Sequence, residues 1–225
     1  TVSVSRNRLL RVRVFEIPTP HGPIPAKEEG TGELGILLAT GAGTGQDSPG
    51  VAGLRSRLAA GGFRVMTFEY AYRAQGRSFP DRQPKLFDVH RAAAQRLREE
   101  VGERLILAGR SMGGRMSTML AAEGEPCRGV VVWGYPLHPA GKPDRLRVDH
   151  LASITVPVLF ISGDNDALAG RDLVERYLVP LPTATVEWIE GADHSFRRRG
   201  TSPDVMLDHL AGVTQEWLLG FGDTT

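Results

Sequence analysis

The sequence has little cysteine, almost no net charge and no long apolar run. Its one cysteine, Cys127, cannot form an internal disulfide, which fits a reducing compartment. With 27 basic and 26 acidic residues, the net charge is +1, so no overall field attracts nucleic acid or an anionic membrane. No apolar stretch is long enough to span a bilayer, and the arginine-rich start is not a secretory signal. These absences predict a cytoplasmic protein with neither a nucleic-acid nor a membrane partner.

The composition is that of a folded protein. Of the 225 residues, 41% are apolar, which is enough to build a full hydrophobic core and too much for a disordered chain. No internal repeat, low-complexity block or linker interrupts the chain. We therefore expect a single domain over residues 1–225.

The hydrophobic pattern predicts an α/β fold. Alternating residues over 10–17 indicate a half-exposed antiparallel strand, which turns at 18–25 into a partner strand. Beyond it, short and continuously apolar runs alternate with helical patterns, as in a mainly parallel, twisted sheet with helices on both faces. The expected strands are 34–40, 63–69, 104–108, 129–133, 156–161 and 185–189, and the expected helices are 48–60, 85–100, 112–123, 171–178 and 203–219.

A glycine-rich loop, Thr40-Gly41-Ala42-Gly43-Thr44-Gly45, follows the first apolar strand. With Glu69 near the end of the next strand, it is similar to a dinucleotide-binding fingerprint. However, Gln46 stands where the third glycine belongs, and no tyrosine has a lysine four residues later. The match to the dinucleotide fingerprint is therefore weak. The loop is a dinucleotide site, a turn without a chemical role, or an anion site of another kind.

The second loop, Gly109-Arg110-Ser111-Met112-Gly113, has the form G-x-S-x-G between an apolar strand and a helix. Glycines on either side of a serine allow the strained turn that presents its hydroxyl at the carboxyl edge of a sheet. The dipole and free N–H groups of the following helix favour an oxyanion there. This position predicts a nucleophile, whereas the alternative is a serine that only caps the helix.

A serine nucleophile needs a base and an acid that orients the base. Of the six histidines, His194 alone lies in the loop directly after the last expected strand, since His209 falls in a helical pattern, and this makes His194 the candidate base. Asp166 has the Gly-x-x-Asp spacing usual for the acid, and Asp164, nearer the strand, stays open as its alternative. Asp193 adjoins the histidine in sequence and is expected to form a turn.

With these candidates, the glycine-rich loop is expected to help bind an oxyanion beside Ser111. In this arrangement the backbone N–H groups of Met112 and Ala42 would form the oxyanion hole, and no metal or other cofactor is needed. No histidine, cysteine and acid cluster has the spacing of metal ligands. We expect four further residues to lie near the substrate cleft: Gly41, Arg110, Tyr135 and His138.

Together these motifs resemble the α/β-hydrolase superfamily, in its dienelactone-hydrolase-like branch. Within it, the chain is most similar to the group of testis-expressed hydrolase-like proteins and a subunit of a chromatin acetyltransferase complex. The resemblance implies Ser111 as nucleophile, Asp166 as acid and His194 as base. The chain departs from the pattern in having Thr40 where many relatives have histidine, and a serine where dienelactone hydrolases have cysteine. The segments that carry the resemblance are 40–43, 109–115, 134–139, 141–143, 163–166 and 193–196.

The predicted activity is that of a serine esterase. Such an enzyme cleaves a carboxylic ester through an acyl-enzyme intermediate. Only about twenty residues, 134–155, separate two expected strands where a cap domain commonly enters this fold, so we expect no cap and a small or accessible ester as substrate. Two alternatives remain: a non-catalytic interaction protein, as among some relatives, and a dinucleotide-dependent oxidoreductase. The sequence leaves the oligomeric state open.

Overall fold

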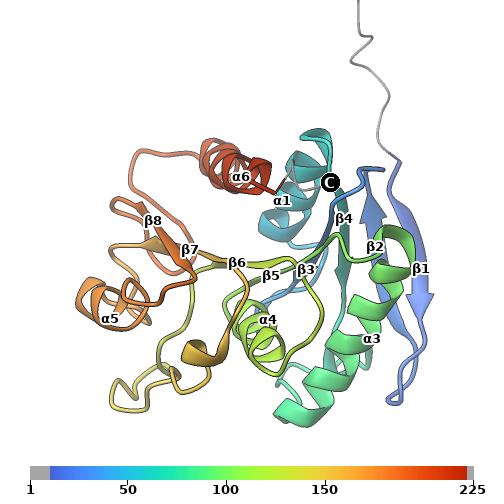
Figure 1. Ribbon diagram of the computed structural model, residues 1–225, viewed down its shortest axis with the longest axis horizontal. Coiled ribbons are helices and arrows are strands. Elements are labelled where there is room, and N and C mark those ends of the chain that lie inside the picture. Colours follow the sequence, from blue (N-terminus) through green and yellow to red (C-terminus); the bar gives the residue numbers. More distant parts are fainter. Residues whose placement is uncertain (1–10, 222–225) are drawn as a thin grey trace, which may run out of the picture.

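A computed structural model describes residues 11–221, which form one eight-stranded sheet with helices on both faces (Figure 1). The strands are β1 (Arg13–Ile17), β2 (Ile24–Glu29), β3 (Gly35–Ala39), β4 (Arg64–Phe68), β5 (Leu105–Arg110), β6 (Gly129–Trp133), β7 (Val158–Gly163) and β8 (Ala184–Ile189). They lie in the order β1-β2-β4-β3-β5-β6-β7-β8. The β1–β2 and β2–β4 pairs are antiparallel, and all other neighbours are parallel. The predicted mainly parallel sheet with an antiparallel N-terminal pair is confirmed.

The helices form one layer on each face of the sheet. They are α1 (Pro49–Ala60), α2 (Ala71–Ala74), α3 (Gln83–Val101), α4 (Met112–Ala122), α5 (Arg171–Tyr177) and α6 (Pro203–Leu219), with a 3₁₀ turn, η1, at Leu151–Ser153. Helices α1 and α6 cover one face, and α3, α4 and α5 cover the other (Figure 1). The connection between β6 and β7 contains only the η1 turn, so no cap domain enters there.

The alternation of side chains along each strand builds two hydrophobic cores. In β3, Ile36 and Leu38 pack with α1 and α6, whereas Leu37 and Ala39 pack with α3 and α4. Because both faces of β3, β5, β6 and β7 are covered, their residues are almost all buried, which explains the continuous apolar runs in the sequence. The edge strand β8 alternates in burial, as an outer strand should.

The predicted elements agree with the structure apart from their ends and two short turns. Sequence patterns missed α2 and η1, which have four and three residues and are too short to show a helical period. Helix α3 begins at Gln83 because Pro84 suits a first helical turn, and it ends at Val101, before Gly102, whose φ of 61° a glycine adopts readily. Of the first predicted strand, Leu10 lies outside the described residues.

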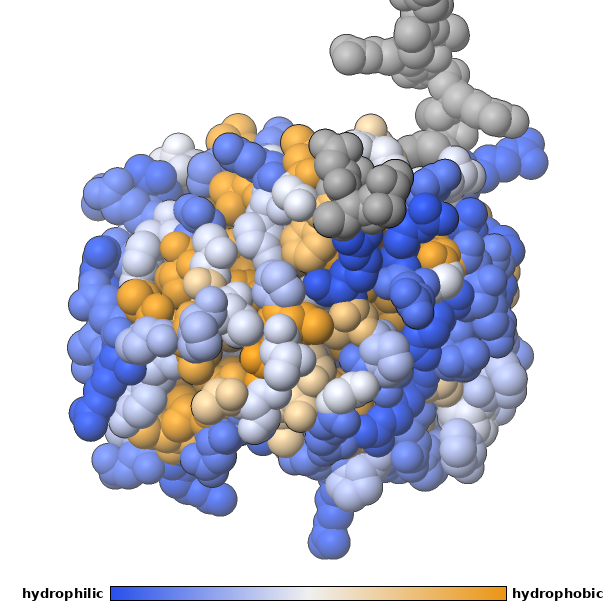
Figure 2. Space-filling model, viewed as in Figure 1, coloured by the Kyte–Doolittle hydropathy of each residue, from blue (hydrophilic) through white to orange (hydrophobic). Residues whose placement is uncertain are grey.

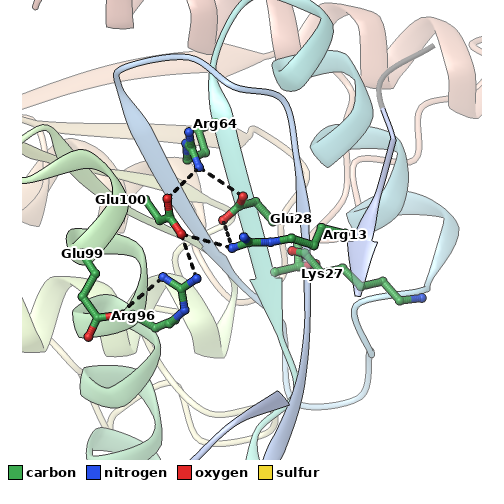
Figure 3. A network of polar contacts seen from close by, with 8 residues as sticks. Arg13, Lys27, Glu28, Arg64, Arg96, Glu99 and Glu100 are labelled. Atoms are coloured by element: carbon green, nitrogen blue, oxygen red, sulfur yellow. Dashed lines mark hydrogen bonds and ion pairs between the residues drawn. The ribbon is translucent and has the colours of Figure 1, made fainter. Parts of the chain in front are cut away.

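An ion-pair network joins the N-terminal hairpin to the rest of the sheet (Figure 3). Glu28 of β2 contacts Arg13 of β1 and Arg64 of β4, and both arginines also contact Glu100 of α3. Arg96 of α3 holds Glu100 from the other side, at 2.8 Å. The network lies at the start of β4, away from the carboxyl ends of the parallel strands. It therefore anchors the hairpin and takes no part in a site at that edge.

A buried ion pair supports the glycine-rich loop from below. Nε of Arg55 in α1 lies 3.2 Å from Glu29 in β2, and both side chains are only 7% exposed. The same guanidinium donates to Thr67 Oγ1 and to the backbone carbonyl of Gln46, which directly follows the loop. Gln46, which stands in place of the third fingerprint glycine, is therefore a buried support for the loop.

Replacing Glu29 with alanine should destabilise the protein strongly, because Arg55 would keep a buried charge without its acid. Breaking a buried pair in this way costs about 3–5 kcal/mol. Glu33→Ala is the matched control, since it removes a surface pair with Arg104 worth at most about 1 kcal/mol. The midpoint of urea unfolding measures both effects. Equal losses in the two variants would contradict the structural role of Glu29.

None of the helices within residues 11–221 is long and apolar enough to cross a bilayer. Figure 2 shows hydrophilic side chains over the flank formed by α3 and apolar ones reaching the surface nearer the centre of the same view. The polar flank belongs to the exposed side of α3, whose buried residues face the sheet.

Candidate active site

Ser111 lies on a strained turn between β5 and α4. Its φ of 51° and ψ of −114° are unusual for a residue with a side chain. Two glycines allow the turn, because a Cβ on Gly109 would lie 2.3 Å from the Gly113 carbonyl carbon, and a Cβ on Gly113 would lie 2.5 Å from the Ala39 carbonyl oxygen. The Ser111 N–H donates to the Trp133 carbonyl, so its hydroxyl is held at the carboxyl edge of the sheet.

The structure brings Ser111, His194 and Asp166 together in one chain of hydrogen bonds. Nε2 of His194 lies 2.8 Å from Ser111 Oγ, and its Nδ1 lies 2.7 Å from Asp166 Oδ2. The Asp166 side chain is fully buried, whereas the imidazole is 25% exposed. The three groups come from loops that are far apart in the sequence. At these distances the imidazole can act as a general base on the serine hydroxyl.

The histidine is held by the tight turn that contains it. Oδ1 of Asp193 accepts hydrogen bonds from the N–H groups of Ser195 and Arg197, which is the turn-forming role expected of this aspartate. A Cβ on Gly134, whose φ is +68°, would lie 3.5 Å from two imidazole atoms, so the backbone after β6 packs close to the ring. The orientation of the imidazole is therefore fixed by its surroundings.

The two candidate acids have different contacts. Asp166 faces the imidazole with Oδ2 and accepts the Leu168 N–H with Oδ1, at 2.7 Å. Oδ1 of Asp164 instead accepts the Gly191 N–H at 2.6 Å, which ties the loop after β7 to the loop after β8. Geometry thus places Asp166 next to the base and gives Asp164 a supporting contact.

The glycine-rich loop brings Ala42 to the same cavity as Ser111. The Tyr72 hydroxyl donates to the Ala42 carbonyl at 2.7 Å, and burial raises the pKa of Tyr72 to about 12, so it stays a proton donor at neutral pH. Met112 begins α4, so its N–H has no acceptor within the helix. The acid of the apparent dinucleotide fingerprint, Glu69, accepts the Gln46 N–H and pairs with Arg73. The Glu69 carboxylate is therefore already bound to groups of the protein itself.

A cavity of about 390 Å³ opens beside Ser111. Its lining includes His138, one of the four residues expected near the cleft, and the expected oxyanion-hole residues Ala42 and Met112. Its lining residues are Ala42, Pro80, Asp81, Gln83, Leu86, Ser111, Met112, Arg115, Met116, Pro136, His138, Pro139, Ala140, Arg147 and Leu168. Among residues 11–221, no cluster of three or more histidine, cysteine or acidic side chains could hold a metal ion.

Three of the expected cleft residues lie outside that lining. Tyr135 is buried beneath it, and its hydroxyl donates to the Arg147 carbonyl at 2.7 Å. Gly41 lies beside Ser111, and a Cβ built on this glycine would be 3.7 Å from Ser111 Cβ. Arg110 is half-buried, and burial lowers its pKa; it forms no ion pair within the part of the chain that the structure describes. Gly41, Arg110 and Tyr135 are therefore not among the residues that line this cavity.

Sequence reasoning missed the charged residues of the cavity. Arg115 stands four residues after Ser111 and so lies on the same face of α4, a spacing that could have revealed it. Arg147 and Asp81 come from loops, and no sequence pattern places them beside the serine. Tyr72 belongs to α2, a helix too short to show a helical period, so no sequence pattern places it at the site either.

Comparisons with known proteins agree with this architecture. The similar solved structures include a serine hydrolase without lid from Xanthomonas campestris, 20% identical with a TM-score of 0.74, over 96% of this chain and 97% of that one. A dienelactone hydrolase from Anabaena variabilis is 20% identical with a TM-score of 0.72, over 94% and 98% of the two chains. The esterase domain of a Rhodothermus marinus protein is 16% identical with a TM-score of 0.69, over 92% and 98%.

At these identities the likeness shows the fold, and it confirms the predicted α/β-hydrolase fold without a cap domain. The family evidence comes from the sequence itself. The family model described as alpha/beta hydrolase domain matches residues 33–218, which is most of the chain. The chain therefore belongs to the alpha/beta hydrolase domain family.

Proposed function

We propose that this protein is a serine hydrolase that cleaves small or accessible carboxylic esters. The observation that supports the proposal best is the continuous chain of hydrogen bonds from Ser111 Oγ through His194 to Asp166, which ends at an accessible cavity. A serine on a strained turn, a base within reach and a buried carboxylate behind the base are the parts that acyl transfer requires.

In the proposed mechanism Ser111 Oγ attacks the carbonyl carbon of the ester. Nε2 of His194 takes the hydroxyl proton, while Nδ1–H donates to Asp166, which fixes the tautomer and stabilises the imidazolium. As the tetrahedral intermediate collapses, the carbon–oxygen bond of the ester breaks and the imidazolium protonates the leaving alkoxide. Water, activated by the same imidazole, then hydrolyses the acyl-enzyme and restores the Ser111 hydroxyl.

The oxyanion of this intermediate would be bound by the N–H groups of Met112 and Ala42. The first stands at the N-terminus of α4, where the helix dipole also favours negative charge. The second N–H belongs to Ala42, whose own carbonyl accepts a hydrogen bond from the Tyr72 hydroxyl. Loss of one such donor typically lowers turnover by about 100- to 1,000-fold.

The dimensions of the site favour small substrates. A cavity of about 390 Å³ is near the lower end of ligand sites, which hold roughly 300–1,000 Å³. The connection between β6 and β7 adds no helical cap that could enclose a long acyl chain. Two of the structural neighbours are named an esterase domain and a serine hydrolase without lid, which agrees with an ester substrate at an open site.

A fluorophosphonate probe tests the proposal, because it reacts only with an activated serine. Wild-type protein should be labelled on Ser111, and a Ser111→Ala variant should not be labelled. Hydrolysis of p-nitrophenyl esters of graded length should show the same dependence and a preference for short acyl groups. Equal labelling of the two proteins would overturn the hydrolase proposal and favour a non-catalytic interaction protein, a role found in the testis-expressed and chromatin-complex subgroup that the motifs resemble.

A further inference from the structure

Two arginines line the cavity beside Ser111: Arg115 of α4 and Arg147 of the β6–β7 connection. Arg115 stands four residues after the serine, which is one turn further along the helix and about 6 Å along its axis. Both arginines also line an adjoining hollow, together with Arg145. Positive charge is therefore concentrated on one side of the candidate nucleophile.

These arginines have no acidic partner. Neither Arg115 nor Arg147 forms an ion pair with any residue from 11 to 221. Nε of Arg115 is buried and has no hydrogen-bond partner within the same range. By contrast, the shielded arginines Arg55, Arg64 and Arg98 all contact carboxylates. Arg115 and Arg147 are partly buried, and their unpaired charges beside a ligand cavity point to an anion supplied by the ligand.

The backbone holds Arg147 in place before any ligand binds. Its N–H donates to the Leu137 carbonyl at 2.8 Å, and its own carbonyl accepts the Tyr135 hydroxyl at 2.7 Å. Both arginines line the same cavity and the hollow beside it, and burial and then repulsion by the Arg115 charge lower the pKa of Arg147. An anion between them would relieve that repulsion without a loop rearrangement.

The other titratable groups nearby do not neutralise the arginines. Asp81, which also lines the cavity, contacts Arg77 at 2.7 Å and lies 3.6 Å from Lys85. Burial, followed by the Arg115 charge, lowers the pKa of His150 to about 4, so this histidine is neutral at pH 7. It is hydrogen-bonded to Thr118. The cavity thus holds two unpaired cations and one acid that already has partners.

We propose that the substrate is an ester carrying one carboxylate group, which Arg115 and Arg147 bind while Ser111 attacks the ester carbonyl. This inference rests on the proposed function and specifies its substrate class. A guanidinium binds a carboxylate in a planar, bidentate geometry that the ammonium group of lysine cannot form. A short spacer between carboxylate and ester fits the one-turn separation of Arg115 from Ser111.

The reaction itself needs no further reactant than water. The ester carbon–oxygen bond breaks, the water oxygen joins the acyl carbon, and the products are an acid and an alcohol. The distal carboxylate is unchanged and serves only for binding. Arg115 and Arg147 are therefore specificity residues, distinct from the groups that move the proton.

Matched ester pairs test this specificity. Monoethyl glutarate is compared with ethyl pentanoate for a carboxylate on the acyl side, and 4-acetoxybenzoate with 4-methylphenyl acetate for one on the leaving group. Wild type should prefer the charged member of at least one pair in kcat/KM. Arg115→Gln and Arg147→Gln should each lower that charged-to-neutral ratio by about 10- to 100-fold, the effect of losing a charge-assisted hydrogen bond. Arg104→Gln, at the opposite end of β5, removes the same charge and should leave the ratio unchanged.

Binding without turnover separates this proposal from the hydrolase proposal. On the Ser111→Ala variant, monoethyl glutarate should bind more tightly than diethyl glutarate in calorimetry, and Arg115→Gln should abolish the difference. Ser111-dependent hydrolysis with no preference for charge would overturn the substrate assignment and keep the hydrolase. Absence of both labelling and ester hydrolysis would overturn the hydrolase. A charged-to-neutral ratio that falls equally in Arg104→Gln would show only a general charge effect and would also overturn the assignment.

Discussion

Replacement of Asp166 by asparagine should lower kcat for ester hydrolysis by roughly 10⁴-fold, the loss typical when the carboxylate behind a catalytic histidine becomes an amide. Asparagine can turn its NH₂ group toward Nδ1 of His194, and Nε2 then carries the proton and can no longer accept one from Ser111. The shape of the side chain is retained, so the fold should change little. Steady-state kinetics on a short p-nitrophenyl ester, with circular dichroism as a fold check, measures this effect.

Asp164→Asn is the matched control, two residues away in the same loop. Its Oδ1 accepts the Gly191 N–H, and an amide oxygen can accept the same bond. This variant should keep kcat within about threefold of wild type, because its interaction with the Gly191 N–H survives the change. If Asp164→Asn lost the larger part of the activity and Asp166→Asn did not, the acid would be misassigned.

The location of the candidate site could be predicted from the sequence because its three residues follow three strands. In a parallel sheet the carboxyl ends of all strands meet at one edge, so Ser111, His194 and Asp166 were expected to converge although they are far apart in the chain. The choice between Asp166 and Asp164 stayed open, since both follow β7. That choice depends on where the Gly191 N–H lies, and only the folded loops determine this.

The lining of the cavity could be predicted only in part. Met112 is expected at the site because its N–H directly follows the serine, and the helical spacing of α4 could have added Arg115. Residues in the connection between β6 and β7 have no period, so the sequence places the loop of Tyr135 beside the site without giving the direction of its side chain. The structure directs its hydroxyl to the Arg147 carbonyl, beneath the cavity. Tertiary contacts of this kind decide loop orientation and leave no mark in a local pattern.

The glycine-rich loop shows how one pattern can fit two chemistries. Backbone close to a pyrophosphate and backbone close to an oxyanion both require small residues after a strand. The position of Glu69 strengthened the dinucleotide alternative, yet its carboxylate accepts the Gln46 N–H and supports the loop. The family match over residues 33–218 places the chain in the alpha/beta hydrolase domain family, which argues against that alternative.

Exchange of Ser111 for glycine should abolish activity and stabilise the protein at the same time. Without the nucleophile, kcat/KM should fall by roughly 10⁴- to 10⁶-fold, as in enzymes of the same chemistry. The serine holds φ at 51° and ψ at −114°, a conformation that costs a residue with a side chain about 1–3 kcal/mol. Glycine adopts it without that cost, although it loses about 0.5–1 kcal/mol through the greater freedom of the unfolded chain.

The alanine variant at the same position separates the two effects. Ser111→Ala lacks the hydroxyl as well but keeps the strained φ, so it should be as inactive as the glycine variant and less stable by about 1 kcal/mol. Urea unfolding at constant m-value measures the difference, and the p-nitrophenyl ester assay measures the activity of both. Equal unfolding midpoints would show that the strain at the turn does not exceed the entropic cost of glycine, about 0.5–1 kcal/mol. Activity within tenfold of wild type in either variant would mean that another group is the nucleophile, because neither glycine nor alanine has a hydroxyl that could attack the substrate.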